Sequence, residues 1–178
     1  MKNDIFILDF KRTYIQILLN FLLMIGFSSC GMYSFTGASI HPEAKTISIE
    51  TFPNLASMVN PTLSQEFTDA LQDKFQSQTS LTVVTSSGDY EIEGEIVGYS
   101  TSPMAIQGNE TAALNRLTIA VNVRFTNKFS DKDNFEQRFS RYVDYDSSRN
   151  LSEVEQELVK QINEVLVEDI FNKAVVNW

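Results

Sequence analysis

The chain has 178 residues, a formal net charge of −9, one cysteine and one histidine. This acidic balance argues against a nucleic-acid-binding protein, because contacts with phosphate groups need clustered Lys and Arg. A lone cysteine permits no disulfide within the chain, so packing must supply the stability of the fold.

The first 30 residues have the layout of a bacterial lipoprotein signal. Lys11 and Arg12 precede an apolar run of about 13 residues, which is too short to span a bilayer. Cys30 follows two small residues, at the point where lipoprotein processing cuts the chain and acylates the thiol. A lone buried thiol is the alternative for Cys30, but the residues after it do not continue an apolar segment. We therefore expect a signal peptide over 1–29 and a lipidated tether over 30–43, held on a membrane by its acyl chains.

The rest of the chain, 44–178, suits one domain with a real core. Removal of residues 1–29, which contain three basic and two acidic residues, takes the net charge from −9 to −10. Alternation predicts a short strand over 44–52. Asn60-Pro61 then predicts a helix start, and the apolar spacing of Leu63, Phe67, Ala70, Leu71 and Phe75 continues it to about Gln78. A β-branched run over 81–84 predicts the next strand.

Strands dominate the second half of the domain. A turn at Ser87-Gly88-Asp89 leads to a strand over 90–100, followed by a long polar loop over 101–113. The clearest strand covers 114–129, with Leu117, Ile119, Val121, Val123 and Phe125 on one face. A tight turn at 131–134 leads to its antiparallel partner over 135–145. Ser152 and Glu155 form a capping box that opens a final helix, whose apolar stripe is Val154, Leu158, Ile162, Val165, Leu166 and Ile170.

The order β-α-β-β-β-β-α predicts an α+β fold with two helices packed on one face of a small mixed sheet of four to five strands. The first two strands should be parallel, because a helix connects them. The shorter later connections imply antiparallel hairpins. The other face, which carries Glu91, Glu93, Glu95, Arg124 and Arg138, should stay open to water or a partner.

Motifs for catalysis, cofactors or metals are missing from the sequence. It contains no G-x-S-x-G elbow, phosphate-binding loop or H-E-x-x-H pair. His41 stands alone on a Pro-flanked linker, which indicates a surface residue. The row of Glu91, Glu93 and Glu95 could serve acid/base chemistry, but a solvated strand face paired with Arg124, Arg138 or Lys128 is the simpler interpretation.

Four arginines, Arg116, Arg124, Arg138 and Arg141, are candidates for binding an anionic lipid head group, because the guanidinium fork suits phosphate. Pairing with acids of the same chain is the alternative. The loop from Gln107 through Asn109 to Arg116 is a candidate for partner contact, and a solvent loop is its alternative.

Several short segments, in this order and spacing, resemble one known family. They are Cys30-Gly31-Met32-Tyr33-Ser34-Phe35-Thr36-Gly37, Thr46-Ile47-Ser48-Ile49, Phe52-Pro53-Asn54, Gln107-Gly108-Asn109-Glu110-Thr111-Ala112-Ala113, Asn115-Arg116-Leu117-Thr118-Ile119 and Phe135-Glu136-Gln137. Together they resemble the lipopolysaccharide-assembly lipoprotein LptE in the form found among Bacteroidota.

The resemblance implies an outer-membrane lipoprotein without catalytic activity. Such a protein sits inside the LptD β-barrel, helps that barrel assemble and assists delivery of lipopolysaccharide to the cell surface. Gly31-Met32-Tyr33 lacks an acidic run, which favours a periplasm-facing anchor. Contact with the barrel or lipopolysaccharide is then expected at Arg116, Arg124, Arg138, Gln107 and Asn109. A lipoprotein that binds another envelope protein or lipid, and a lipid-anchored enzyme, are the alternatives.

Overall fold

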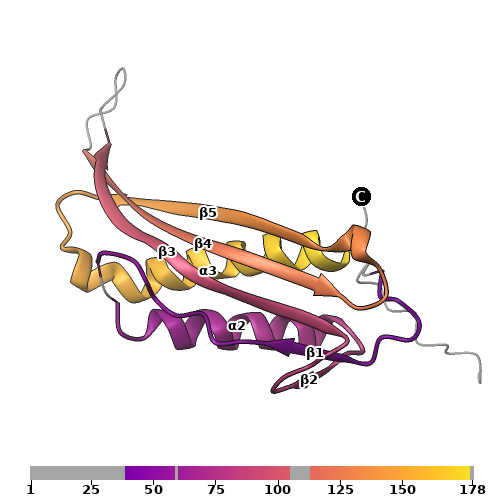
Figure 1. The fold of residues 1–178 in the computed structure, drawn as a ribbon. Helices are drawn as coiled ribbons and strands as arrows, with labels where there is room; N and C mark the ends of the chain where they lie inside the picture. Colours follow the sequence, from indigo (N-terminus) through magenta and orange to yellow (C-terminus); the bar gives the residue numbers. More distant parts are fainter. Residues whose placement is uncertain (1–38, 59, 105–112, 177–178) are drawn as a thin grey trace, which may run out of the picture. The chain divides into compact units, whose positions relative to one another are not determined.

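The computed structural model describes residues 39–58, 60–104 and 113–176. In these residues the elements follow the predicted order, with two α-helices and five strands. They are β1 (Thr46–Ile49), α2 (Leu63–Gln78), β2 (Thr82–Val84), β3 (Tyr90–Met104), β4 (Leu114–Asn127), the 3-10 helix η1 (Asp131–Asp133), β5 (Phe135–Asp146) and α3 (Leu151–Val175). Figure 1 shows both helices on the same side of the sheet. The predicted α+β arrangement is therefore confirmed.

The sheet has the strand order β2-β1-β3-β4-β5. β1 is parallel to β2, as predicted from the helix between them, and β4 is antiparallel to both β3 and β5. The prediction of a hairpin after residue 84 is wrong, because β2 and β3 both pair with β1 and not with each other. β1 therefore lies between the two strands that follow it in the chain.

The loop between β2 and β3 has to cross β1, and two of its residues make the crossing possible. A Cβ on Gly88 would lie 2.4 Å from the Ser48 backbone nitrogen, so a residue without a side chain is needed there. Asp89 then accepts hydrogen bonds at Oδ2 from the backbone N–H groups of Lys45, at 2.9 Å, and Thr46, at 3.0 Å. These bonds hold the pKa of the Asp89 carboxyl below its ordinary value. The loop thus fixes the start of β1 as well as that of β3.

α2 begins at Leu63 with Thr62 as its N-cap residue, two residues later than Asn60-Pro61 predicts, although the Asn60 side chain still binds the backbone at the helix start. Its Oδ1 accepts hydrogen bonds from the backbone N–H groups of Thr62, at 3.0 Å, and Leu63, at 3.1 Å. Pro61 precedes the first hydrogen-bonded turn, where its missing N–H costs nothing. The capping geometry explains why the helix begins at this point in the chain.

The capping box predicted at Ser152 and Glu155 is wrong. α3 begins at Leu151, with Asn150 as the preceding residue, and the Asn150 amide donates to Glu153 at 3.2 Å. Asn is as good an N-cap as Ser, and here Asn150 takes that position, two residues before Ser152. Glu155 instead accepts a hydrogen bond from Asn60 at 3.1 Å and another from the hydroxyl of Tyr99.

β3 is longer than predicted. Residues 101–104, assigned to a polar loop from the sequence, continue the strand and pair with residues 114–117 of β4. Pro103 is tolerated because β1 pairs with β3 only as far as Ile92, so in the described part of the sheet β3 is an outer strand at Pro103. A register shift between Ile96 and Gly98 keeps the apolar residues on the helix side.

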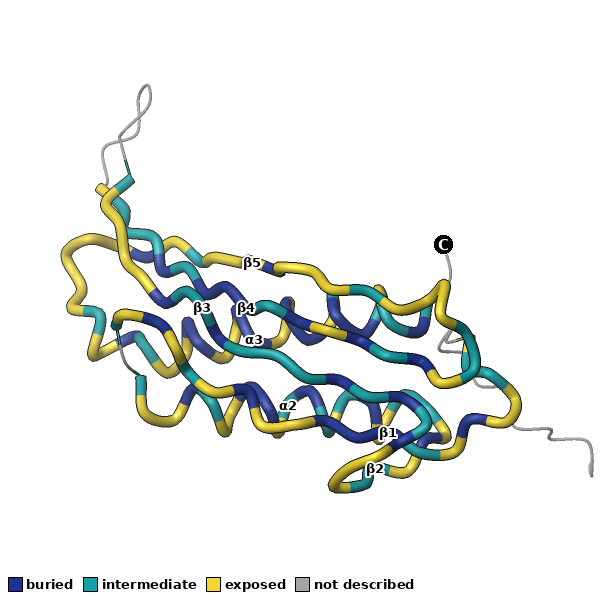
Figure 2. Tube along the Cα trace, in the orientation of Figure 1, coloured by how far each residue is buried: buried dark blue, intermediate teal, exposed yellow. Residues whose placement is uncertain are grey.

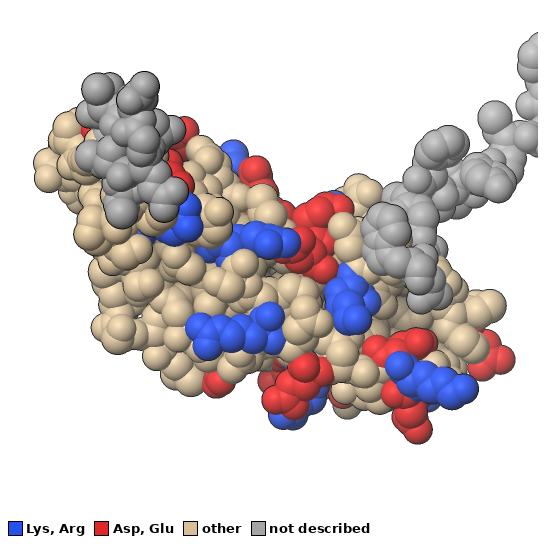
Figure 3. Space-filling model, turned by 90° about the horizontal axis from the view of Figure 1, so that it is seen from above, with Lys and Arg blue, Asp and Glu red and all other residues tan. Residues whose placement is uncertain are grey.

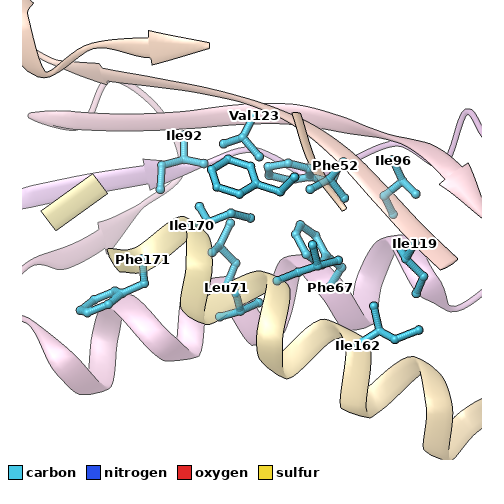
Figure 4. Close-up of a cluster of buried hydrophobic side chains, with 14 of the residues drawn as sticks. Phe52, Phe67, Leu71, Ile92, Ile96, Ile119, Val123, Ile162, Ile170 and Phe171 are labelled. Carbon is cyan, nitrogen blue, oxygen red and sulfur yellow. The ribbon is translucent and has the colours of Figure 1, made fainter. Parts of the chain in front are cut away.

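The core lies between the sheet and the two helices, as Figure 4 shows for Phe52 and for residues of α2, β3, β4 and α3. The predicted apolar face of β4 is confirmed, since each of its five residues is at most 1% exposed. The α3 stripe is confirmed except for Val165, which is 47% exposed. A second line of buried α3 residues, not predicted, comprises Val159, Asn163, Val167 and Phe171. In Figure 2 the buried positions of both helices turn toward the sheet or toward each other.

Candidate functional site

The sheet face opposite the helices is the candidate functional surface, here called the open face. It is defined by side chains at alternate positions of β3, β4 and β5: Glu91, Glu93, Glu95, Arg116, Thr118, Asn122, Arg124, Glu136, Arg138, Tyr142 and Asp144. Figure 3, which views the sheet from above, shows basic and acidic side chains next to one another on this face. The prediction that Glu91, Glu93, Glu95, Arg124 and Arg138 share one face is confirmed, and no helix or strand of the described residues covers that face (Figure 1).

Arg124 is the centre of the first charged cluster. Its guanidinium lies 2.7 Å from Glu93 on β3 and 3.3 Å from Glu136 on β5, so it bridges three strands. Lys128 makes a longer pair with Glu91, at 3.4 Å. The predicted pairing of the glutamate row with Arg124 and Lys128 is therefore confirmed, although Glu95 accepts a hydrogen bond from the Asn122 amide instead.

Arg116, near the start of β4, is the centre of the second charged cluster. Its Nε and Nη2 donate to the two carboxylate oxygens of Asp144 at 2.7 and 2.8 Å, a bidentate pair. This pairing lowers the pKa of the Asp144 carboxyl. The same guanidinium stacks on the ring of Tyr142, with Cζ 3.5 Å from the ring centre, and Tyr142 is 54% exposed. An oriented guanidinium and an accessible aromatic ring are thus presented together to the solvent.

The remaining two arginines lie on opposite faces of β5. Arg138 is on the open face, where its Nη2 reaches over the sheet to Gly98, and it forms no ion pair within the described residues. Arg141 points toward the helices, where its Nε donates to Asp169 of α3 at 2.6 Å. The four arginines therefore do not form one anion-binding cluster. Arg116, Arg124 and Arg141 adopt the alternative of pairing within the chain.

Other predicted residues fall in different places. His41 is half-buried, not simply a surface residue, because its ring stacks on Phe129 at 4.5 Å between centroids. Cys30, Gln107 and Asn109 lie outside the described residues.

Tyr142 and Asp144 belong to the Arg116 cluster, although neither was predicted from the sequence as a site residue. Alternation along β5 places both on the open face with Arg138. The signal that would have joined them to Arg116 is the register of β4 against β5, in which Arg116 faces Asp144 directly.

The chemistry of the open face suits recognition by charge and hydrogen bonding. Among residues 39–58, 60–104 and 113–176, no group of three or more His, Cys, Asp or Glu could hold a metal ion. The helices in the described part of the chain are not long and apolar enough to cross a membrane. Exposed arginines, carboxylates and a tyrosine ring favour a binding surface for a polar partner.

Solved structures with similar folds come from several bacteria. One is a minor lipoprotein from Acinetobacter baumannii, 12% identical, covering 73% of this chain and 91% of that chain with a TM-score of 0.49. Another is the protein CT253 from Chlamydia trachomatis, 8% identical, covering 75% of this chain and 99% of that chain with a TM-score of 0.51. A third is the rare lipoprotein B from Shewanella oneidensis, 10% identical, covering 72% and 90% with a TM-score of 0.44.

A search among curated proteins gives no match. The LptE family, described as lipopolysaccharide-assembly, matches residues 44–174. This match takes in every strand and both helices of the described fold, starting two residues before β1 and ending one residue before the last residue of α3. The chain therefore belongs to the LptE family of lipopolysaccharide-assembly proteins.

Proposed function

We propose that this chain is the lipoprotein partner of an LptD-like β-barrel in the outer membrane. In this role it plugs the barrel, helps it assemble and assists transport of lipopolysaccharide to the cell surface. The observation that supports the proposal is the family match over 44–174, which spans the whole folded domain and not one motif within it. No catalytic step and no cofactor are part of the proposal.

The anchor in this proposal is Cys30, acylated after removal of residues 1–29. Eight residues lie between Cys30 and Ser39, where the described fold begins, which makes nine residue steps. An extended chain of this length spans about 30 Å at most, so the domain stays close to the membrane surface. We infer that it faces the periplasm.

The contact surface in this proposal is the open face, with Gln107 and Asn109 added to Arg116, Arg124 and Arg138. The helices fill the other side of the sheet with core, which leaves the open face available for a partner. Arg138 and the stacked pair of Arg116 with Tyr142 supply hydrogen-bond donors and an aromatic surface for polar groups of the barrel or of lipopolysaccharide.

Affinity purification of the tagged full-length chain from detergent-solubilised outer membranes tests the proposal. The expected result is recovery of a large β-barrel protein in a fixed ratio to the tagged chain. A Cys30→Ala variant is the matched comparison and should leave the membrane fraction in cells that lack the barrel. Recovery of a different envelope protein without the barrel would favour the alternative of another partner.

A further inference from the structure

The two edges of the sheet differ in how they are protected. β2 has three residues and is followed at once by the loop that crosses β1. β5 has 12 residues, contains no Pro or Gly, and pairs with β4 without a register shift. In the described part of the chain no strand pairs with the outer side of β5. Figure 1 shows β5 as the long outer strand, and Figure 2 shows most of it exposed.

An outer strand of this kind has free hydrogen-bonding groups. In an antiparallel ladder every second residue directs its N–H and C=O groups at the neighbouring strand, so the other half of the β5 backbone points outward. Natural proteins usually shorten, bend or charge such an edge. The inward-pointing charge on β5, Arg141, is matched by Asp169 and so does not block an incoming strand.

A groove runs beside this edge, with α3 as its second wall. It has a volume of about 550 Å³ and is lined by residues 137–141 of β5 together with Asp169, Asn172 and Lys173 of α3. A strand added to β5 would lie over these α3 side chains. Backbone pairing and side-chain contacts are therefore available at the same place.

The charge of the groove is unusual for this chain. Its ionisable residues are Arg138, Arg141, Lys173 and Asp169, a net charge of +2 in a chain with a net charge of −9. Three other grooves lined by described residues differ in net charge when their ionisable residues are counted in the same way. The groove between α2 and α3 carries −2, the groove beside the start of β5 carries +1, and the groove on the open face carries −3. Arg141 is neutralised by Asp169, whereas Arg138 and Lys173 have no acidic partner within the described residues.

We propose that the outer edge of β5 binds an extended, acidic segment of another polypeptide, which adds a sixth strand to the sheet. Its side chains would alternate between the open face, where Arg138 lies, and the groove wall, where Lys173 lies. Backbone hydrogen bonds supply affinity, and the two cations select acidic side chains on both faces of the segment. The inference does not depend on the identity of the barrel partner.

Binding of a labelled peptide to the full-length chain, purified in detergent, tests the inference. The probe is a short peptide in which Glu-Glu and Val-Val pairs alternate, so that Glu side chains lie on both faces of the added strand, and its binding is followed by fluorescence anisotropy. A peptide with Lys in place of Glu is the charge control. A peptide with the Glu and Val sequence but N-methylated at alternate backbone nitrogens is the strand control, because it keeps the charge and loses the ladder hydrogen bonds. The unmodified acidic peptide should bind at least about tenfold more tightly than either control, a difference of about 1.4 kcal/mol.

Charge variants locate the binding edge. Arg138→Glu with Lys173→Glu should weaken binding of the acidic peptide by about tenfold. Lys160→Glu is the matched control, because it makes the same change at an exposed lysine of α3 that does not line the groove, and it should leave binding unchanged.

Three results would overturn the inference. Equal binding of the N-methylated peptide would mean that charge alone attracts the probe. Displacement of the peptide by micelles that contain phosphatidylglycerol would indicate an anionic-lipid site instead. A parent protein that is dimeric, together with an Arg138→Glu, Lys173→Glu variant that is monomeric, would indicate that a second copy of the chain covers the edge. The peptide controls use the unaltered protein, so they decide the matter even if the double variant fails to fold.

Discussion

Asp89 shows how much of this fold depends on one side chain at a strand start. Its carboxylate accepts hydrogen bonds from the backbone of Lys45 and Thr46 and from the Thr46 hydroxyl, and these bonds bring the crossing loop onto β1. The ionised carboxylate accepts hydrogen bonds more strongly than a protonated one, which is why folding lowers the pKa of Asp89. Folding and ionisation of this group are therefore linked.

Asp89→Ala should lower the melting temperature at pH 7, because two backbone N–H groups lose their acceptor. A carboxyl whose pKa is lowered by folding stabilises the protein above its unfolded pKa, and this contribution is lost as the pH falls through the folded value. The difference in melting temperature between Asp89→Ala and the parent should therefore be largest at pH 7 and should shrink below the ordinary pKa of 3.8. Thermal melting from pH 7 to pH 2.5 measures it. Asp89→Asn is the control: it also lacks the titrating carboxyl, so its difference from the parent should shrink over the same acid range, whereas the difference between Asp89→Asn and Asp89→Ala should stay constant with pH because neither side chain titrates.

The helices and strands differ in how far the sequence predicts them. α2 follows directly from Asn60-Pro61 and the four-residue spacing of Leu63, Phe67, Leu71 and Phe75, because local sequence carries both its cap and its buried face. The end of β3 was missed because Pro103 reads as a turn residue, and only its position on an outer strand makes it tolerable. The place of β1 between β2 and β3 was missed because connection length does not reveal that Gly88 allows one strand to be crossed.

The way in which the strands pair also limits how much of the candidate site can be predicted from the sequence. Pairing of Arg124 with the glutamate row followed from alternation within strands, since charges on one face of neighbouring strands meet. The group of Arg116, Tyr142 and Asp144 depends on the β4–β5 register, which alternation does not fix. The direction of Arg141 toward α3 follows from alternation instead, because Arg141 and Arg138 are three positions apart on β5. Periodicity thus predicts which face a residue is on, and register decides its partner.

Phe67 is a test of the packing between α2 and the sheet. It is fully buried and meets the Phe52 ring edge-on at 5.1 Å. Phe67→Ala should lower the free energy of unfolding by about 3–5 kcal/mol, because it removes a large buried side chain and leaves a cavity. Leu55→Ala, in the loop that precedes the helix, is the control at a residue that is 62% exposed, and should cost less than about 0.5 kcal/mol. Urea denaturation measures both, and equal small losses would contradict the helix-on-sheet core.

At the scale of the whole domain, the core and the proposed contact surface lie on different faces of the sheet. The side toward α2 and α3 carries the apolar core, whereas the open face carries exposed ion pairs. Exposed pairs contribute little to folding. Changes on the open face can therefore be made without removing the fold, so they can test the proposed partner contact separately from stability.

A charge exchange between Arg116 and Asp144 tests whether the open face meets the partner. Arg116→Glu alone places two acids opposite each other, so it should lower the melting temperature and also reduce recovery of the barrel in the affinity purification. Combining it with Asp144→Arg restores an ion pair across β4 and β5, so the melting temperature should return toward that of the parent. If Arg116 contacts the barrel or lipopolysaccharide, barrel recovery should nevertheless stay at least about tenfold low, because like charges facing a partner cost several kcal/mol. Recovery that returns together with the melting temperature would show that Arg116 serves only the pair within the chain. Lys160→Glu, the same change of charge at an exposed residue of α3 away from the open face, controls for the added negative charge.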